Sequence, residues 1–600
     1  MTYVPPLRDI RFVLDHIADL AGLAALPGFE HADRDTVYSL IEEYGRFVAD
    51  VIAPLNRVGD LQGARFDAGT GAVTTPDGFV DAYRRYVEAG WNAVPFDPEY
   101  GGGGFPWTLA VTMQEMFTSA NMAFSLSPLL TQGAIDLLET WGSDEQKAMY
   151  LPKLISGEWT GTMNLTEPEA GSDVGALRTR AVPAADGTWR ITGTKIFITY
   201  GEHDLADNIV HLVLARVPDA PDGTRGISLF LVPKFVVGAD GGLGERNDVK
   251  CVSIEHKLGI HASPTCVLSF GDGGGAVGYM VSEPNSGMRS MFTMMNNARL
   301  SVGLQGLAIA ERAYQQSLAY AQERRQGRAP GAPAGESSPI IDHPDVRRML
   351  FTQRAYIEAM RALVYTNARA LDTAHNHPDA DERAKGQELA DLLTPLSKGW
   401  CTDLGNELTS VAVQIYGGMG YVEETGAAQH YRDARIAAIY EGTNGIQAID
   451  LVARKLPMRS GQVVKELIAR MGEIDADLAA HDDLALLRQN LADGLSGLTD
   501  ASEYLGTALA ADASDALAGA TPYLRLFATV VGGWLMARQA VVAKAAIAGG
   551  SRDTAFLEAK VVTARFYGEQ LLPPAVALVP VVKAGAADLF AVDAGQLAGV

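Results

Sequence analysis

The spacing of apolar residues changes twice along the chain, and this change of period constrains the fold more than any other feature. Residues 1–160 repeat apolar side chains at helical spacing, for example at Val37, Ile41 and Tyr44. From about Gly161 the pattern alternates and is broken by Gly, Asp and Pro, and the helical spacing then returns. This order predicts an α+β multi-domain protein whose β segment lies between two helical ones.

Four segments follow from these changes of period. Residues 1–160 are expected to form an N-terminal helical domain, and residues 161–285 a small β-barrel or sandwich with an Asp-Gly hairpin turn. Residues 286–456 are predicted to be helical around an exposed proline-rich loop. Residues 457–600 are rich in Ala and Leu and carry no motif, so we expect a helical extension packed on the main body or on a second subunit.

The charge balance excludes one broad class of function. The 600 residues include 72 acidic and 49 basic side chains, for a formal net charge of -23. A general nucleic-acid binder needs basic surface to displace counterions from phosphates, so no nucleic-acid partner is expected. An acidic surface instead favours solubility or a basic partner.

Cysteines and histidines give no sign of a metal site or a disulfide framework. The three cysteines are far apart in sequence and form no CxxC motif, which favours a reduced, cytoplasmic setting. Two pairs of histidines lie close in sequence, but no clustered carboxylate or cysteine completes a ligand set. These residues are Cys251, Cys266 and Cys401, and His256 with His261 and His375 with His377.

No segment resembles an export signal or a membrane span. Charged residues interrupt the first twenty positions, so they contain no apolar core of the kind that a signal peptide has. The most apolar stretch, residues 526–537, lies between Arg525 and Arg538 and is well short of the roughly 20 residues that cross a bilayer. We expect it to be a buried core helix in a protein without stable membrane insertion.

The first motif with chemical content is MNLTEPEAGSDVG, which runs from Met163 to Gly175 at the start of the β segment. Its side chains are small or hydroxylated, and its glycines allow a ligand to approach the backbone closely. Such a loop suits a planar polar ligand and a phosphate. Taken alone, the motif favours the alternative of an ordinary glycine-serine turn.

The second motif is KIFITYG, at Lys195 to Gly201. Strand alternation places Phe197 and Thr199 on one face, where a ring and a hydroxyl can stack on a ligand ring and bond its edge. The alternative is that Phe197 is simply a core residue.

The third motif covers Gln414 to Leu456 and begins QIYGGMGY. Its glycine pair at Gly417 and Gly418 is expected to end a helix, and Glu441 lies in the loop-like sequence YEGTNG before the next helix. A carboxylate in such a loop is placed to reach into a cavity. Taken alone, Glu441 also suits a helix-capping role.

Together and in this order, the three motifs resemble the acyl-CoA dehydrogenase family over about residues 35–456. TEPEAGSD, the aromatic-Ile-Thr triplet, QIYGGMGY and IYEGT all stand at family-like spacings. The opening PPLRDIRFVLDHI, the HPDVRRML after the proline-rich loop and the C-terminal extension resemble the long bacterial subfamily that contains 3-methylthiopropionyl-CoA (3-methylmercaptopropionyl-CoA) dehydrogenase.

This resemblance implies an N-terminal helical domain, a central β-barrel and a C-terminal four-helix bundle, with FAD between barrel and bundle in a homodimer or dimer of dimers. It also assigns roles to individual residues. The FAD-binding residues would be Met163, Leu165, Thr166, Ser172, Phe197, Thr199 and Thr443, with Arg324, Gln414, Gly417 and Gly418 reaching the FAD of the other subunit. The substrate-binding residues would be Ser172, Arg299, Tyr440 and Gly442.

Glu441 aligns with the catalytic base of the family. In the mechanism that the resemblance implies, the base removes the α-proton of a saturated acyl-CoA while a β-hydride goes to the flavin, which leaves trans-2-enoyl-CoA. Some relatives place their base at the position of Ala298, which cannot accept a proton here. Arg299 beside it resembles a family arginine near the thioester path, although a plain helix-surface arginine is an equal alternative.

Two departures from the family pattern concern the contact with the second FAD. The chain has Glu323-Arg324-Arg325-Gln326-Gly327 where many relatives have Glu-Arg-x-Thr-Phe-Gly. Gly445 stands where relatives often carry glutamine. The usual threonine and phenylalanine contacts to the neighbouring cofactor are therefore missing.

The resemblance implies an acyl-CoA dehydrogenase that passes its electrons to an electron-transferring flavoprotein. An acyl-CoA oxidase using oxygen and a non-catalytic flavin-binding scaffold are the alternatives. For the substrate, short straight, medium straight and 3-methylthiopropionyl groups remain open, because one methylene is worth only about 1 kcal/mol of discrimination.

Overall fold

The computed structural model describes residues 3–599, apart from the side chain of Asn296. These residues divide into two compact units. The central unit contains residues 42–301 with residues 3–5, and the helical unit contains residues 6–41 and the chain from residue 302 onward. The central unit is therefore an insertion in the sequence of the helical unit.

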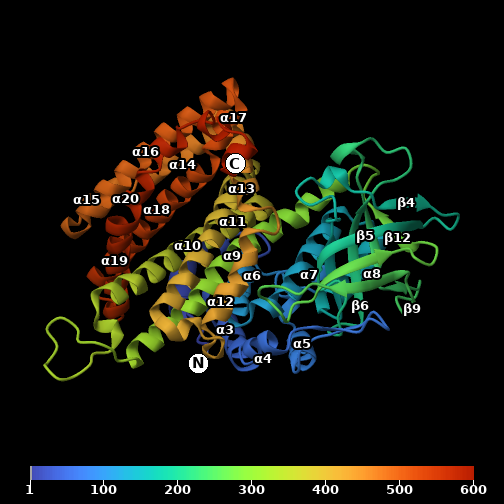
Figure 1. Ribbon diagram of the computed structural model, residues 1–600, viewed down its shortest axis with the longest axis horizontal. Helices are drawn as coiled ribbons and strands as arrows, with labels where there is room; N and C mark the ends of the chain where they lie inside the picture. Colours follow the sequence, from blue (N-terminus) through green and yellow to red (C-terminus); the bar gives the residue numbers. More distant parts are fainter. Residues whose placement is uncertain (1–2, 600) are drawn as a thin grey trace. The chain divides into compact units, whose positions relative to one another are not determined.

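Helices α4 to α8 of the central unit precede the strands of its large sheet in the sequence (Figure 1). α6 and α7 are buried along nearly their whole length, which explains why their sequences show little polar periodicity. α8 begins at a capping box in which Ser143 and Gln146 bond each other's backbone N–H groups. The helices are α4 Leu55–Gln62, α5 Phe79–Glu88, α6 Trp107–Ala120, α7 Met122–Trp141 and α8 Asp144–Ser156, and α3 Arg34–Phe47 crosses from one unit to the other.

An eight-stranded sheet forms the second half of the central unit. Its strand order is β10-β11-β5-β12-β7-β6-β3, with β4 paired to β5. All pairs are antiparallel except β3 with β6. The strands are β3 Trp159–Asn164, β4 Arg180–Pro183, β5 Trp189–Thr199, β6 Asn208–Ala215, β7 Ser228–Pro233, β10 Val249–Ile254, β11 Thr265–Phe270 and β12 Ala276–Val281, with short ribbons β1 Arg65–Phe66 with β2 Val73–Thr74 and β8 Phe235–Val237 with β9 Leu243–Arg246.

The expected closed barrel is not confirmed. Within the described residues, the end strands β10 and β3 do not pair with each other, so the sheet remains open. The expected hairpin is present: Pro183 pairs with Trp189 across the Asp-Gly turn, and Gly187 has a φ of +82°. Left-handed backbone of this kind favours glycine, which explains why the sequence signal was reliable there.

Both faces of the sheet's centre are buried. Along β6, Leu212 and Leu214 belong to a core shared with α7 and α8, whereas Val213 and Ala215 belong to a second core shared with β10 and β11. Strands that are covered on both faces are expected to carry continuous apolar runs. The sequence NIVHLVLA follows that expectation.

The long helices α9, α10 and α11 form the first part of the helical unit, together with several shorter ones (Figure 1). α18 packs against α10 and α11, so the C-terminal extension shares a core with the preceding helices. The expected proline-rich loop, residues 327–339, is mostly exposed between α9 and α10. The helices up to residue 456 are α1 Leu7–His16, α2 Leu20–Ala24, α9 Gly287–Glu323, α10 Pro344–Asn376, α11 Ala380–Tyr416, α12 Ala427–Ala434 and α13 Asn444–Asp450, and the start of α9 belongs to the central unit.

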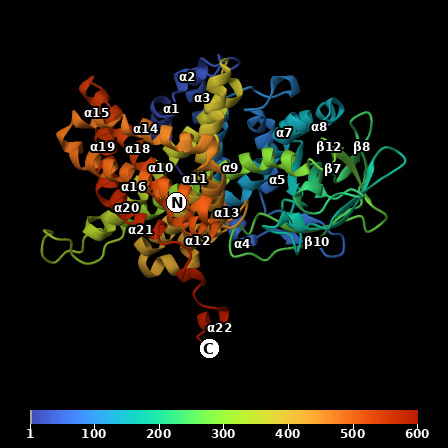
Figure 2. The ribbon, with the colours of Figure 1, turned by 90° about the horizontal axis from the view of Figure 1, so that it is seen from above.

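The extension is helical to the end of the described chain, as predicted. Figure 2 shows its last helix extending away from the other helices of this unit. Leu589, Phe590 and Leu597 near that end are largely exposed. The helices are α14 Gln462–Gly472, α15 Asp475–Ala479, α16 Ala485–Ala511, α17 Ala513–Ala518, α18 Ala520–Ala548, α19 Thr554–Phe566, α20 Leu572–Val576, α21 Val579–Val582 and α22 Ala594–Leu597.

The apolar stretch at 526–537 lies within α18 and is buried, as expected. In the part of the chain that the structure describes, α18 alone is long and apolar enough to cross a membrane by length and composition. Its most apolar window is 83% buried inside the fold.

A buried group of charges joins the first helix to the extension. Asp9 of α1 pairs with Arg361 of α10 and with Lys560 of α19, and Lys560 also lies 3.2 Å from Glu358. Arg361 reaches Glu311 of α9 at 2.9 Å. Burial raises the pKa of Asp9, but Lys560 and Arg361 outweigh it and lower that pKa to about 2. The first helix is therefore held by Lys560, which lies close to the other end of the chain.

Candidate functional site

The residues singled out by the sequence lie in two separate groups, one in each unit. In the central unit they gather around the β3–β4 loop, residues 165–179, and the end of β5. In the helical unit they lie in the Glu441 loop, residues 439–443, and at the adjoining ends of α9 and α11.

The β3–β4 loop follows directly from a buried parallel strand. Met163, Leu165 and Thr166 are half-buried, whereas Ser172 at the far side of the loop is exposed. Glu167 and Ala170 exchange backbone hydrogen bonds of 3.1 and 3.0 Å, which closes a tight turn within the loop. The loop is thus an ordered structure that presents both side chains and backbone to solvent.

A β-bulge in β5 places Phe197 outside the sheet. Ile198 pairs with Cys266 and Lys195 with Leu268, so β5 contains one more residue than β11 over this interval. Phe197 has a φ of +59°, and its side chain is 57% exposed. Bulges of this kind often redirect a side chain beside a functional site. A positive φ in an aromatic residue is strained backbone, which also points to function.

Strand alternation predicted that Phe197 and Thr199 share one face of β5, and the burial of the residues around them agrees with this. Ile198 between them is buried, whereas Thr199 is half-buried and Phe197 exposed. The alternation does not continue upstream, because the bulge shifts the phase and turns Lys195 fully inward. Phe197 is therefore not the core residue that was the alternative interpretation.

A buried ion pair supports this site from inside, and sequence reasoning missed it. Lys195 Nζ lies 2.8 Å from Glu167 Oε1, and the two side chains are 0% and 5% exposed. Burial lowers the pKa of Lys195 to about 8, an effect that the charge of Glu167 opposes. Both residues belong to quoted motifs, and a lysine directly before the apolar run Ile196–Ile198 of the strand was the signal that could have identified them.

Arg299 lies in the part of α9 that belongs to the central unit. It is only 7% exposed, and its guanidinium lies 5.9 Å from the centre of the Phe292 ring. The same stretch of helix is fixed to α7, where Trp141 donates to Thr293 at 2.9 Å. The alternative of a helix-surface arginine is therefore wrong, because the side chain is buried.

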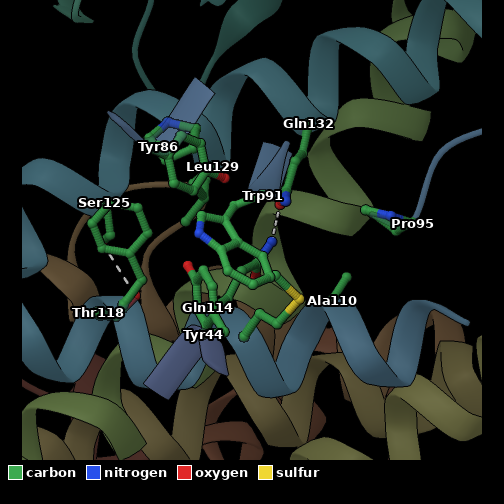
Figure 3. Close-up of a pocket in the computed structure, with 13 residues that line it drawn as sticks. Tyr44, Tyr86, Trp91, Pro95, Ala110, Gln114, Thr118, Ser125, Leu129 and Gln132 are labelled. Atoms are coloured by element: carbon green, nitrogen blue, oxygen red, sulfur yellow. Dashed lines mark hydrogen bonds between the residues drawn. The ribbon is translucent and has the colours of Figure 1, made fainter. Parts of the chain in front are cut away.

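A small cavity of about 20 Å³ lies between α6 and α7 in the central unit (Figure 3). Aromatic side chains of Tyr44, Tyr86 and Trp91 line it, and the amides of Gln114 and Gln132 hydrogen bond beside it. None of the residues that the sequence predicted for the site lines this cavity.

In the helical unit, the Glu441 loop enters α13 through strained backbone. Glu441 has a φ of +56° and Gly442 a φ of +83°. Thr443 is the N-cap of α13, because its hydroxyl accepts from the N–H of Ile446 at 3.2 Å. The helix-capping alternative for Glu441 is therefore wrong: Thr443 caps the helix, and the half-buried carboxylate of Glu441 belongs to the turn before it.

The side chains of Asn444 and Tyr440 hold this turn on its two sides. The side-chain amide of Asn444 bonds Lys398 Nζ at 2.9 Å, Thr402 Oγ1 at 3.0 Å, the carbonyl oxygen of Gly399 at 3.1 Å and Asp403 Oδ1 at 2.6 Å, all on α11. On the other side, the hydroxyl of Tyr440 donates to the side-chain oxygen of Gln305. Asn444 was not predicted as a site residue, although it lies inside the quoted EGTNG sequence.

The ends of α9 and α11 complete the group in the helical unit. α11 ends at Tyr416, and Gly417 follows with a φ of +60°, as the glycine pair predicted. Tyr416 stacks on Tyr320 of α9 with ring centres 4.1 Å apart. This contact brings the ends of the two helices together, so that Arg324, Gln414, Gly417 and Gly418 are all exposed at the same end of the unit.

A wide apolar surface continues from this end of α11. Tyr421 is 90% exposed, and Met419 and Val422 beside it are also exposed. Exposed contiguous apolar residues of this kind often mark a protein interface. Among the described residues, no group of three or more His, Cys, Asp or Glu side chains is placed to hold a metal ion.

Family models match nearly the whole chain. "Acyl-CoA dehydrogenase, N-terminal domain" matches residues 38–158, the middle domain of the same family residues 162–272 and its C-terminal domain residues 285–456. "Acetyl-CoA dehydrogenase C-terminal like" matches residues 470–593.

Two curated relatives align along almost their full length. The 3-methylmercaptopropionyl-CoA dehydrogenase of Ruegeria pomeroyi is 48% identical over 576 residues, which is 95% of this chain and 96% of the relative. A butyryl-CoA dehydrogenase of Syntrophomonas wolfei is 37% identical over 608 residues, 98% of each chain.

Solved structures share the fold. Caenorhabditis elegans ACDH-11 in complex with C11-CoA superposes with a TM-score of 0.76 at 19% identity, over 98% of this chain and 95% of that one. An acyl-CoA dehydrogenase from Bacillus anthracis complexed with FAD gives 0.71 at 20% identity, over 92% of each chain. A chain in the structure of the electron transferring flavoprotein of Acidaminococcus fermentans gives 0.57 at 26% identity, over 70% of this chain and 97% of that one.

Proposed function

This chain belongs to the acyl-CoA dehydrogenase family, and we propose that Glu441 is the base with which it converts a saturated acyl-CoA into trans-2-enoyl-CoA. The observation that carries the assignment of the base is the Glu441 loop. Its carboxylate stands on a left-handed turn and is not needed to begin α13, because Thr443 caps that helix. Strained residues persist where function requires them.

FAD is the cofactor of this family, and the exposed groups of the central unit fit it. The ring of Phe197, held outside the sheet by the bulge, offers a surface for stacking on the flavin, and Thr166 and Thr199 offer hydroxyls for its polar edge. Met163 and Leu165 would contact its apolar part, and the exposed Ser172 would serve the phosphate or CoA side. When bound, FAD supplies the acceptor for the β-hydride.

The proton chemistry falls to the Glu441 loop. An α-proton of a thioester is too weakly acidic for a carboxylate in water, so fixed donors must stabilise the charge that develops on the carbonyl oxygen. We assign one of these donors to the backbone N–H of Glu441, as in the family. Burial, together with the charge of Glu441, raises the pKa of Tyr440, so its phenol stays protonated beside the base.

The exposed groups at the ends of α9 and α11 support a dimer as the active unit. Arg324, Gln414, Gly417 and Gly418 would contact the FAD of a second subunit, and Thr443 the diphosphate. Gly442 and Tyr440 would bind the acyl-CoA, and the buried Arg299 is assigned as a further substrate-binding residue from the family resemblance. Within residues 323–327, where the chain departs from the family pattern, Arg324 directly follows α9 and is the residue that we assign to that contact.

The substrate and electron acceptor are inferred from the relatives. Similarity to a 3-methylmercaptopropionyl-CoA dehydrogenase and a butyryl-CoA dehydrogenase supports a short acyl group, with the thioether acyl group as the first choice. Similarity to a chain from an electron transferring flavoprotein structure supports that protein as the electron acceptor. We further propose a cytoplasmic location and the four-segment division 1–160, 161–285, 286–456 and 457–600.

The test is anaerobic bleaching of the flavin absorbance by a panel of acyl-CoAs. The panel contains butyryl-CoA, octanoyl-CoA and 3-methylthiopropionyl-CoA, each added in excess to the purified holoprotein. We expect fast bleaching by 3-methylthiopropionyl-CoA, re-oxidation by electron-transferring flavoprotein and little hydrogen peroxide in air. Rapid peroxide formation would instead identify an acyl-CoA oxidase, and bound FAD that no acyl-CoA bleaches would favour a non-catalytic scaffold.

A further inference from the structure

The buried pair of Glu167 and Lys195 connects the two segments of the central unit that we propose to contact FAD. Glu167 lies in the β3–β4 loop and Lys195 in β5, next to the bulge. Two opposite charges that are almost fully buried lose most of their hydration, so the pair is costly unless each partner is well bonded. Its bonding pattern therefore shows which groups the pair holds in place.

Both partners bond the loop backbone. Lys195 Nζ donates to the carbonyl oxygen of Leu165 at 3.0 Å, at the start of the loop. Glu167 accepts from the backbone N–H groups of Arg178 at 2.6 Å and Thr179 at 3.1 Å, at the end of the loop. Thr179 Oγ1 adds a third donor to Glu167 at 2.6 Å. The carboxylate thus ties the loop's two ends together, and the ammonium ties that closed loop to β5.

The bulge is tied to the same loop. The N–H of Ile196, the residue after Lys195, donates to the carbonyl oxygen of Thr166 at 2.9 Å. Thr166 directly precedes Glu167, so this bond lies beside the ion pair in both segments. The strained backbone at Phe197 is therefore held between the ion pair on one side and the β11 ladder on the other.

We propose that Glu167 and Lys195 are positioning residues for FAD, which fix the backbone of Thr166 and the bulge at Phe197 in the geometry that binds the flavin. Packing alone does not require these charges, because well-fitted apolar side chains often replace a buried ion pair without loss of stability. Apolar side chains cannot, however, accept from Arg178 and Thr179 or donate to Leu165. The inference rests on FAD being the cofactor.

The test separates positioning from stability by comparing Lys195→Met, Glu167→Leu and the double variant. For each apoprotein, the melting temperature and the Kd for FAD are measured, the latter by quenching of flavin fluorescence. We expect each single variant to lower the melting temperature and weaken FAD binding. The double variant should recover most of the melting temperature, while its Kd for FAD stays at least ten-fold above that of the wild type.

Two further variants keep the test decisive. Lys234→Met is the control, because it breaks another lysine-glutamate pair of the central unit, with Glu202, whose carboxylate keeps Arg246 at 2.7 Å; it should lower the melting temperature less than Lys195→Met does and leave the Kd unchanged. Thr179→Val removes one donor to Glu167 and should raise the Kd several-fold at a nearly unchanged melting temperature.

Three results would overturn the proposal: wild-type FAD affinity in a folded double variant, wild-type affinity in Thr179→Val, or an equal loss of affinity in the Lys234→Met control. A wild-type apoprotein that binds no FAD would refute the proposed function itself, before any variant is compared.

Discussion

Phe197 and Glu441 have nearly the same unusual backbone conformation, with φ of +59° and +56°, but the protein holds them in different ways. Phe197 follows a buried ion pair, whereas Glu441 lies between a tyrosine-glutamine bond and the amide of Asn444. The two positions also differ in what they present, because one offers a rigid ring and the other a base that must exchange a proton. The ion pair of Glu167 and Lys195, the charged anchor, thus supports Phe197, whose ring carries no charge in any state. The side chain of Asn444, the amide anchor, supports Glu441, whose carboxylate must gain and lose a proton.

The largest expected effect removes the base itself. Glu441→Gln keeps the shape of the loop but cannot accept a proton, so flavin reduction by acyl-CoA should slow by about 10²- to 10⁴-fold. Bound FAD should be retained. Stopped-flow bleaching measures the rate, and the exposed Glu424→Gln is the matched control. Rapid reduction of the flavin by the Gln variant would show that another residue is the base.

The next effect breaks the charged anchor. Lys195→Met leaves the carboxylate of Glu167 buried without its counter-charge, and breaking such a pair costs about 3–5 kcal/mol. Urea unfolding of the apoprotein, monitored by the fluorescence of the central unit's tryptophans, measures the free energy of unfolding. A loss of under about 1 kcal/mol would mean that the ion pair is not an important anchor.

A smaller effect breaks the amide anchor. Asn444→Ala removes a hydrogen-bond partner from Lys398, Thr402 and Asp403, which is expected to cost about 1–3 kcal/mol. Because the turn that carries Glu441 then loosens, kcat should fall more than FAD affinity does. Steady-state kinetics and FAD titration of the same preparation measure both. A loss of FAD affinity as large as that of Lys195→Met would remove the contrast between the two anchors.

The smallest expected effect is a difference in acid sensitivity. Burial raises the pKa of Glu167, but Lys195 and the donors around the carboxylate outweigh it, so the pKa lies below its ordinary value of 4.5. The carboxylate's contribution to stability is therefore fully present above pH 4.5 and is lost as the pH falls through the lowered pKa. Asn444 and Thr443 do not titrate, and burial raises the pKa of Asp403, which Asn444 bonds, instead of lowering it.

FAD release on acidification should accordingly show a step below pH 4.5 that Glu167→Gln lacks. Flavin fluorescence during a slow titration from about pH 6 to about pH 3.5 measures it, and the release of FAD from the Gln variant gives the baseline. Identical release curves for the two proteins would show that protonation of Glu167 does not loosen the site.

Local features of the fold were predictable from the sequence because they depend on neighbouring residues. The change of period located the sheet, the Asp-Gly pair located a hairpin, and the glycine at 417 located the end of α11. The site motifs were readable for the same reason, since each is a continuous stretch of the sequence.

Features that depend on distant residues were not predictable. The bulge at Phe197 is defined by its pairing with β11, and alternation within β5 gives no sign of a phase shift. The expected barrel depended on whether the end strands meet, which no local pattern encodes. The burial of Arg299 likewise depends on α7, far away in the sequence, so the sequence alone left a surface position as an equal alternative.

The pairing of Asp9 with Lys560 has a consequence for how the chain is made. The two residues stand near opposite ends of the sequence, and the whole central unit is synthesised between them. At about 5–20 residues per second, a ribosome needs roughly half a minute to two minutes to make Lys560 after Asp9 has emerged. During that time the extension offers no partner for Asp9. The whole central unit, in contrast, is synthesised before Lys560 and can already fold. Arg361 of α10 can pair with Asp9 before the extension is made, and Lys560 then completes the buried group of charges from the other end of the chain.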